Sequence, residues 1–153
     1  MSTVKAVEKV EQLVERARSL EKQLEKLNSK LASATADELM SQANEIHGIK
    51  VLATTVENVD TKTLREIVEH AKNKLHNAVV ILATVDGDKV SVVAGVSKDQ
   101  TSKVKAGDLA NFVAAKIGGK GGGKPDLAQA GGNNPAALSG ALREVEELIY
   151  GLL

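Results

Sequence analysis

The stretch AVVILATVDGDKVSVVAGV (residues 78–96) decides the fold. Its first eight residues are almost all apolar and many are β-branched, which is typical of a strand buried on both faces. Asp86, Gly87 and Asp88 predict a tight turn, after which residues 89–96 return antiparallel to the first strand. A buried hairpin of this kind predicts a β-sheet at the centre of the domain.

The segment before this hairpin predicts another strand and a helix. IKVLATTV (49–56) is a second continuous β-branched run and predicts a buried strand. Asp60 or Thr61 can cap a helix that follows it. The apolar residues of this helix recur at helical spacing: Leu64, Ile67, Val68, Ala71 and Leu75.

The segment after the hairpin predicts three helices and a strand. Ser97 to Gln100 forms a capping box that opens a short helix. Leu109, Phe112, Val113 and Ile117 mark a second helix, which Gly118 ends, and Phe112 is expected in the core. DLAQAGG (126–132) predicts a short strand. Asn134 as cap and Pro135 as first helical residue begin the last helix, whose apolar residues are Leu138, Leu142, Val145 and Ile149. The fold class is α/β, with a mixed sheet flanked by helices.

The N-terminal segment carries a heptad pattern. Apolar residues are spaced three and four apart: Val10, Leu13, Ala17, Leu20, Leu24, Leu27 and Leu31. Such a seam predicts a long helix that packs against a partner, as in a coiled coil. The partner is either a second copy of the chain or another part of the same protein, and the sequence leaves both open.

A second capping box, Thr35 to Glu38, predicts that a new helix starts near Ala36. This helix is expected to run through Met40 toward His47 and to end at Gly48. The expected organisation is therefore a helical arm over residues 1–36 and a globular domain over 37–153.

Composition excludes several classes of protein. Cysteine is absent, which excludes disulfides and thiolate zinc sites. No apolar run reaches the length of about 18 residues that a membrane span needs, and the N-terminus lacks a secretory signal, so we expect a cytoplasmic protein. The formal net charge is zero, but residues 98–124 hold six lysines and two aspartates. This local basic excess can attract phosphates.

The segment GGKGGGKPD (118–126) resembles a nucleotide-phosphate loop but departs from it. The residue that should carry a magnesium-binding hydroxyl is Pro125, and the segment follows a helix rather than a strand, so we exclude nucleotide hydrolysis. One alternative is a tight connection. The other is a phosphate-binding loop whose bare backbone approaches RNA closely, with charge from Lys120 and Lys124.

The motifs VSKDQTSKVKAGDL (96–109) and GGKGGGKPDLAQAGG (118–132) resemble the C-terminal domain of the alanyl-tRNA synthetases, a DHH-associated type of domain. The resemblance covers about residues 49–150 and, in general character, part of the helical arm that precedes them. The family usually has Arg at position 124 and often Met at 127, where this chain has Lys and Leu. Lysine keeps the charge but lacks the planar fork that grips a phosphate at two points.

The resemblance implies a tRNA-binding module without catalysis or cofactor. Such a module binds the outer corner of tRNA, where the D- and T-loops meet, so that aminoacylation and editing act on the same tRNA. Some members of the family form dimers. The alternatives are a dimerisation or scaffolding element that uses the N-terminal seam, a general DNA-binding module, and a residual hydrolase.

The hydrolase alternative is the weakest of these. The related DHH phosphoesterases carry a His after the glycines and an Asp-His-His metal motif. This chain has Lys124 after the glycines and lacks the motif. We expect no metal site and interpret His47, His70 and His76 as ordinary histidines.

The predicted contacts to RNA are mainly lysines. Two aromatic residues are too few for a base-stacking platform, so we expect shape and phosphate recognition. The glycines at 121–123 would permit close approach, and Asp126 and Gln129 would hold the loop. The complete set is Lys98, Lys103, Lys105, Lys120, Gly121, Gly122, Gly123, Lys124, Asp126 and Gln129.

Overall fold

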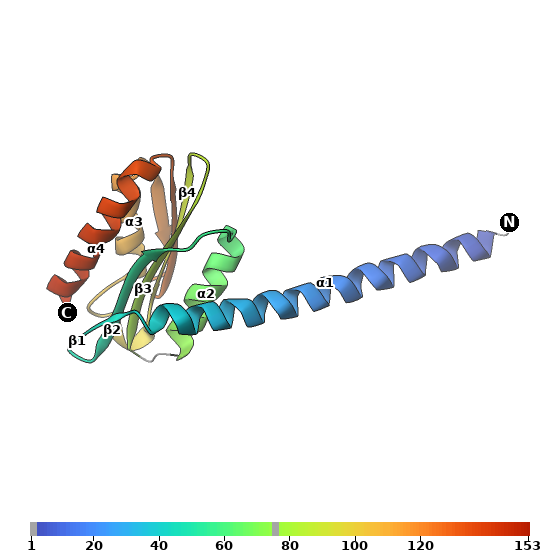
Figure 1. Cartoon of the computed structure of the whole chain (residues 1–153), viewed down its shortest axis with the longest axis horizontal. Helices are drawn as coiled ribbons and strands as arrows, with labels where there is room; N and C mark the ends of the chain where they lie inside the picture. Colours follow the sequence, from blue (N-terminus) through green and yellow to red (C-terminus); the bar gives the residue numbers. More distant parts are fainter. Residues whose placement is uncertain (1–2, 75–76) are drawn as a thin grey trace. The chain divides into compact units, whose positions relative to one another are not determined.

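The predicted hairpin forms the middle of a six-stranded sheet. The computed structural model describes residues 3–74 and 77–153. The hairpin consists of β3 (Ala78–Asp86) and β4 (Lys89–Val96), and residues 78–84 of β3 are all buried. The strand order is β1-β2-β3-β4-β6-β5, so β3 and β4 are covered on both edges (Figure 1). The sequence therefore identified the most buried strand correctly.

The sheet is mixed, as expected. β2 (Ile49–Thr55) runs parallel to β3, and every other neighbouring pair is antiparallel. β6 (Leu127–Gly132) confirms the strand predicted after the glycines. The glycine segment itself differs from the prediction: residues Lys120–Gly123 form the edge strand β5 rather than a loop.

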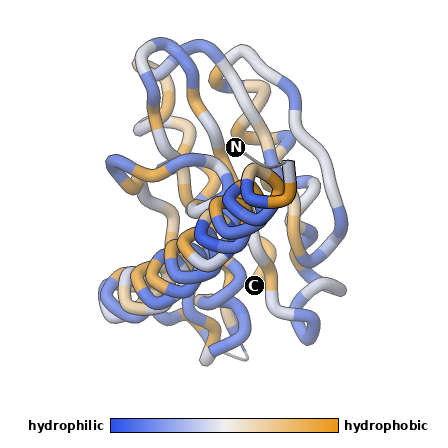
Figure 2. The backbone as a smooth tube through the Cα atoms, turned by 90° about the vertical axis from the view of Figure 1, so that its right-hand side faces the viewer, coloured by the Kyte–Doolittle hydropathy of each residue, from blue (hydrophilic) through white to orange (hydrophobic). Residues whose placement is uncertain are grey.

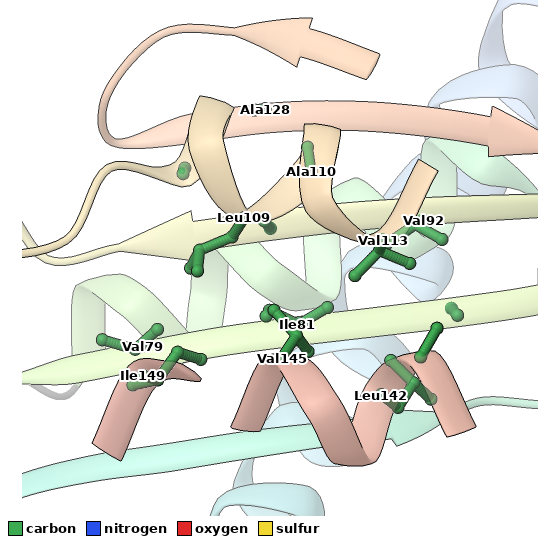
Figure 3. Close-up of a cluster of buried hydrophobic side chains, with 14 of the residues drawn as sticks. Val79, Ile81, Val92, Leu109, Ala110, Val113, Ala128, Leu142, Val145 and Ile149 are labelled. Carbon is green, nitrogen blue, oxygen red and sulfur yellow. The ribbon is translucent and has the colours of Figure 1, made fainter. Parts of the chain in front are cut away.

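Helices cover the two faces of the sheet with separate cores. α2 (Thr61–Lys74) packs on one face, and α3 (Ala106–Lys116) and α4 (Leu138–Leu152) pack on the other. Figure 3 shows the second core, where Val145 and Ile149 of α4 and Val113 of α3 meet Val79 and Ile81 of β3. Burial of about ten such side chains, at roughly 2 kcal/mol each, dominates the stability of the domain.

Glycine at position 95 explains how closely α2 approaches the sheet. A Cβ atom added to Gly95 in β4 would overlap Cγ1 of Val68 in α2. Val68 is fully buried in the core between α2 and the sheet. The absence of a side chain at 95 is therefore what seats α2 over β4.

The first helix, α1 (Thr3–Met40), is continuous, so the predicted break near Ala36 is wrong. The chain divides into two compact units, residues 1–31 and 32–153, and the last turns of α1 belong to the second unit. There Ala32, Ala36 and Met40 are buried in the same core as α2. Because these residues are spaced four apart, packing keeps the chain helical through the predicted capping box.

An ion pair adds to this packing. Nζ of Lys74 lies 2.8 Å from both carboxylate oxygens of Asp37 and donates to Oγ of Ser33 at 2.8 Å. Since Asp37 and Ser33 lie on the final turns of α1, the pair fixes this stretch against the C-terminal end of α2. An exposed pair of this kind contributes less than about 1 kcal/mol.

The predicted extension of this helix to His47 is also wrong. The helix ends at Met40, and residues Asn44–Ile46 form β1, which pairs with the start of β2. His47 and Gly48 both have positive φ, 51° and 78°, and connect the two strands as a two-residue turn. Positive φ at both positions is typical of two-residue hairpin turns whose backbone twist matches the twist of the paired strands. Gly48 therefore serves a hairpin rather than a helix end.

The predicted caps have mixed outcomes. Asp60 caps α2, since its Oδ1 accepts a hydrogen bond from the backbone N–H of Thr63 at 2.8 Å. Ser97 precedes a short 3-10 helix (Lys98–Gln100), but its Oγ accepts from the N–H of Ala78 at 2.9 Å instead of capping. Asn134 makes no side-chain cap, although Pro135 does open a 3-10 helix (Pro135–Ala137) ahead of α4.

Two further expectations concern single side chains. Phe112 is half-buried rather than fully in the core, and Nζ of Lys116 lies 5.6 Å from the centre of its ring. Leu75 and His76 lie outside the described residues. Among the helices that the structure describes, none is long and apolar enough to cross a membrane.

The cap at Asp60 gives a pH-dependent prediction. Hydrogen bonds from the side chain and backbone of Thr63 hold the pKa of Asp60 below its ordinary value of 3.8. A carboxyl whose pKa is lowered on folding stabilises the fold above its unfolded pKa, and this stability is lost as the pH falls through the folded value. Asp60→Ala should therefore lower the unfolding free energy by about 1 kcal/mol at pH 7 and by much less near pH 2.5. Urea titrations at both pH values measure this, and an equal deficit at both would contradict it.

Candidate nucleic-acid interface

The β5–β6 hairpin is a strand pair in which glycine is required for two different reasons. A Cβ at Gly121 would lie 2.8 Å from Cβ of Ala130 and 3.1 Å from backbone atoms of Ala110 in α3. Gly123 has a φ of 153°, and a Cβ there would lie 2.6 Å from Cα of Ala128. These glycines let the edge strand lie flat between β6 and α3. Gly122 differs, because a Cβ there would meet nothing within 4 Å.

The turn that joins β5 to β6 is fixed by backbone hydrogen bonds. The N–H of Lys124 donates to O of Leu127 at 2.9 Å, which closes the turn. O of Pro125 accepts from Ala106 at 2.7 Å, and O of Asp126 accepts from Val96 at 2.9 Å. The turn is thus tied to the start of α3 and to the end of β4, and the exposed side chain of Lys124 projects from an anchored backbone.

A hollow of about 530 Å³ lies between this hairpin and α2. It forms because α2 covers β3 and β4 but leaves the same face of β6 and β5 open. Gly122 and Gln129, which are paired across the two strands, share this face. The complete lining is Arg65, Glu69, Lys72, Gly122, Gly123, Lys124, Asp126, Leu127, Ala128 and Gln129.

Two ion pairs set the charge of this hollow. Nζ of Lys72 lies 3.3 Å from Oδ2 of Asp126, and both side chains are mostly buried. Nε of Arg65 lies 3.6 Å from Oε1 of Glu69 one turn along α2. Among the described residues, Lys124 is the one lining cation without a carboxylate partner.

The Lys72–Asp126 pair keeps Asp126 ionised. Burial by itself raises the pKa of this carboxyl, but the hydrogen bond and charge of Lys72 outweigh it, with a smaller contribution from Lys98. The net result is a pKa below the ordinary 3.8. Asp126 is therefore an anion at neutral pH, and it joins the turn of the hairpin to α2.

The structure brings together half of the predicted site residues. Gly122, Gly123, Lys124, Asp126 and Gln129 line the hollow. Gly121 faces α3 instead, and Lys120 is exposed at the start of β5.

The other predicted lysines lie elsewhere. Lys98 lines a second hollow of about 340 Å³ beside Lys72, Asn73, Ser97 and Asp99. Lys103 and Lys105 are exposed on the loop before α3.

The sequence did not identify the α2 side of the hollow. Arg65, Glu69 and Lys72 are spaced four and three apart, which places them on one helical face. That spacing was available in the sequence, but the strand they face was not. His47 and His70 belong to no group of metal-binding side chains in the part of the chain that the structure describes, and His76 is outside it.

Comparison with known proteins decides the family. Residues 48–151 match the DHHA1 domain. This chain belongs to the DHHA1 domain family. A solved structure of the C-Ala domain of Aquifex aeolicus alanyl-tRNA synthetase resembles this DHHA1 domain with a TM-score of 0.67 and 30% identity, covering 71% of this chain and 98% of that one.

Curated relatives agree with this assignment. Alanine--tRNA ligase of Methylobacillus flagellatus is 57% identical over 137 residues, which cover 90% of this chain and 16% of the relative. The enzyme of the same name from Burkholderia orbicola is 55% identical over 139 residues, or 91% of this chain and 16% of the relative. The chain thus spans about a sixth of the length of these ligases and corresponds to their C-terminal domain, as the sequence predicted.

Proposed function

We propose that this DHHA1 domain is the tRNA-binding C-terminal module of an alanyl-tRNA synthetase. It would hold the outer corner of tRNA so that aminoacylation and editing act on the same molecule. The observation that carries the proposal is the glycine edge strand β5, which begins with the exposed Lys120 and is followed directly by the exposed Lys124. A strand without side chains lets an RNA backbone approach the main chain closely.

The distribution of the lysines supports recognition of a shaped surface. Lys98, Lys103 and Lys105 are exposed on the segment that precedes α3, and the start of α3 is bonded to the β5–β6 turn. A folded RNA corner presents phosphates over a surface rather than along a single strand, so lysines on both of these segments can contact it. Neither aromatic residue is fully exposed, since Phe112 and Tyr150 both pack against the core. Phosphate contact therefore supplies the affinity, and aromatic stacking does not.

Affinity of the isolated chain should be modest and should depend on salt. If about four phosphates are neutralised, the logarithm of the binding constant should fall with the logarithm of salt concentration with a slope near −3. Within a synthetase the binding would be intramolecular, so a weak contact would still hold the tRNA. A mobility-shift titration of folded tRNA at low salt tests the proposal. Migration that is unchanged at a large excess of the chain would overturn it, and equal binding of duplex DNA would favour a general nucleic-acid-binding module.

A second candidate function is self-association through α1. In residues 3–31 the six large seam residues are between 57% and 64% exposed: Val10, Leu13, Leu20, Leu24, Leu27 and Leu31. Apolar and polar residues alternate along this helix (Figure 2). An exposed heptad seam of this length favours a coiled coil with another copy.

Light scattering of seam variants tests this second function. If the seam joins two copies, the full chain should be a dimer, and Leu20→Glu/Leu27→Glu should be a monomer. The matched control Ser19→Glu/Ser29→Glu adds the same charge outside the seam and should remain a dimer. A wild-type chain that is monomeric at high concentration would exclude the scaffold. Truncation before residue 38 is unsuitable, because it would remove Ala32 and Ala36 from the core.

A further inference from the structure

The hollow between α2 and the β5–β6 hairpin has a lining that does not suit a phosphate. The phosphodiester of an RNA backbone only accepts hydrogen bonds, and it is repelled by carboxylates. Two carboxylates line this hollow, Glu69 and Asp126, and each pairs with a cation of α2. Of the three described cations that line the hollow, Lys124 has no carboxylate partner, and it belongs to the turn of the hairpin. A phosphate would therefore bind at Lys124. The rest of the lining of the hollow suits a ligand group other than a phosphate.

The interior offers both donors and acceptors. Glu69 and Asp126 present carboxylate oxygens, and Arg65 and Lys72 present N–H groups. The side-chain amide of Gln129 has both kinds of atom and no hydrogen-bond partner among the described residues. An uncharged group with N–H donors and carbonyl or ring-nitrogen acceptors on one edge satisfies such a lining. The edge of a nucleobase has this composition.

The shape of the hollow fits a flat group. Its floor is the open face of β5 and β6, where Gly122 leaves the space above the strand empty and Leu127 adds half-buried apolar surface. Arg65 stands on the wall with about half of its side chain exposed. Arginine guanidinium planes stack on unpaired bases in complexes with RNA. A base could thus lie between the glycine strand and Arg65.

We propose that the hollow captures one unstacked nucleobase of the bound RNA, with the phosphate of that nucleotide on Lys124. The proposal rests on RNA binding as the proposed function. It adds recognition of a base to a surface that otherwise recognises the shape and phosphates of the RNA. Because two carboxylates line the hollow, it should prefer adenine, cytosine and guanine, which carry an amino group. Uracil presents its one N–H between two carbonyl oxygens, and a carboxylate repels both.

NMR titrations of the full chain with nucleoside monophosphates test the proposal. AMP, CMP and GMP should shift the backbone amides of Gly122 and Gly123 and the side-chain amide of Gln129. They should bind at least about threefold more tightly than UMP, the difference expected from one hydrogen bond. Inorganic phosphate should shift Lys124 and leave the Gln129 side chain unchanged.

A matched pair of variants on α2 tests the role of the carboxylates. Glu69→Gln removes one of the two lining charges and should reduce the preference for CMP over UMP, while Asp126 remains as the other carboxylate. Glu66→Gln removes the same charge from a residue of α2 that does not line the hollow, and it should keep the preference. The control Glu66→Gln should also retain binding to tRNA.

The outcomes separate this inference from the proposed function. Equal shifts with UMP and CMP, shifts confined to Lys124, or no shift at millimolar nucleotide would overturn base capture, even if tRNA still binds. Failure of the wild-type chain to bind tRNA would overturn the proposed function itself. If the Glu69→Gln variant keeps the full preference for CMP over UMP, Glu69 does not recognise the amino group of the base.

Discussion

Gly119→Ala should destabilise the domain more than any other single methyl addition in the glycine segment. A Cβ at Gly119 would overlap O of Gly131 and lie 2.7 Å from Cα of Gly132, both backbone atoms of β6. Backbone cannot rotate away as a flexible side chain can, so the start of β5 or the end of α3 must shift. We expect a loss of about 3 kcal/mol or more in unfolding free energy.

Urea denaturation followed by Tyr150 fluorescence measures this loss, because α4 carries the tyrosine of the globular unit. The matched control is Gly122→Ala, where a Cβ meets nothing within 4 Å and φ is not left-handed. The control should change stability by less than about 0.5 kcal/mol. If both variants unfold at the wild-type urea concentration, then the close packing of the glycine strand against β6 is wrong.

Lys120→Ala/Lys124→Ala should weaken tRNA binding about tenfold and reduce the salt slope by about 1.5. The two lysines flank the glycine strand and are both exposed, so their removal should not perturb the core. The effect should be similar for different tRNA sequences, since phosphate contacts carry no sequence information.

A control with the same loss of charge is Lys50→Ala/Arg143→Ala, on β2, which three strands separate from β5, and on α4, which packs on β2. This control should bind within about twofold of the wild type, because its charges are far from the proposed contact. Equal losses in the two double variants would mean that general charge, rather than the β5–β6 hairpin, governs binding.

The sequence predicted the elements in which the order of apolar and polar side chains follows their burial. Continuous apolar runs located β2 and β3, and helical spacing located α2, α3 and α4, because burial imposes these patterns directly. β5 was missed for a physical reason. Glycine has no side chain, so a strand made of it shows no alternation, and its pairing partner decides its conformation.

The remaining errors have other causes. β1 has three residues, too few for a sequence pattern, and its pairing with β2 depends on a turn at His47 and Gly48 whose positive φ values the sequence does not reveal. The capping box at Thr35 was overridden because Ala32, Ala36 and Met40 pack onto α2. Local signals therefore fail where a tertiary contact of several kcal/mol opposes a cap of about 1 kcal/mol.

Half of the candidate site was predictable and half was not. The glycines and Lys124 stand out in the sequence, but Lys72 meets Asp126 across 54 residues of chain. No local pattern indicates which strand a polar helical face will meet. The hollow, with its two carboxylates, therefore emerges only from the fold.

Hydroxyl-radical footprinting of folded tRNA bound to the chain tests the central claim most directly. The account predicts protection of the sugar-phosphate backbone at the outer corner, where the D- and T-loops meet. With Lys120→Ala/Lys124→Ala this protection should be lost at the same protein concentration. Protection confined to the acceptor or anticodon stem, or protection that persists in the double variant, would contradict the claim that the glycine edge strand contacts the RNA backbone.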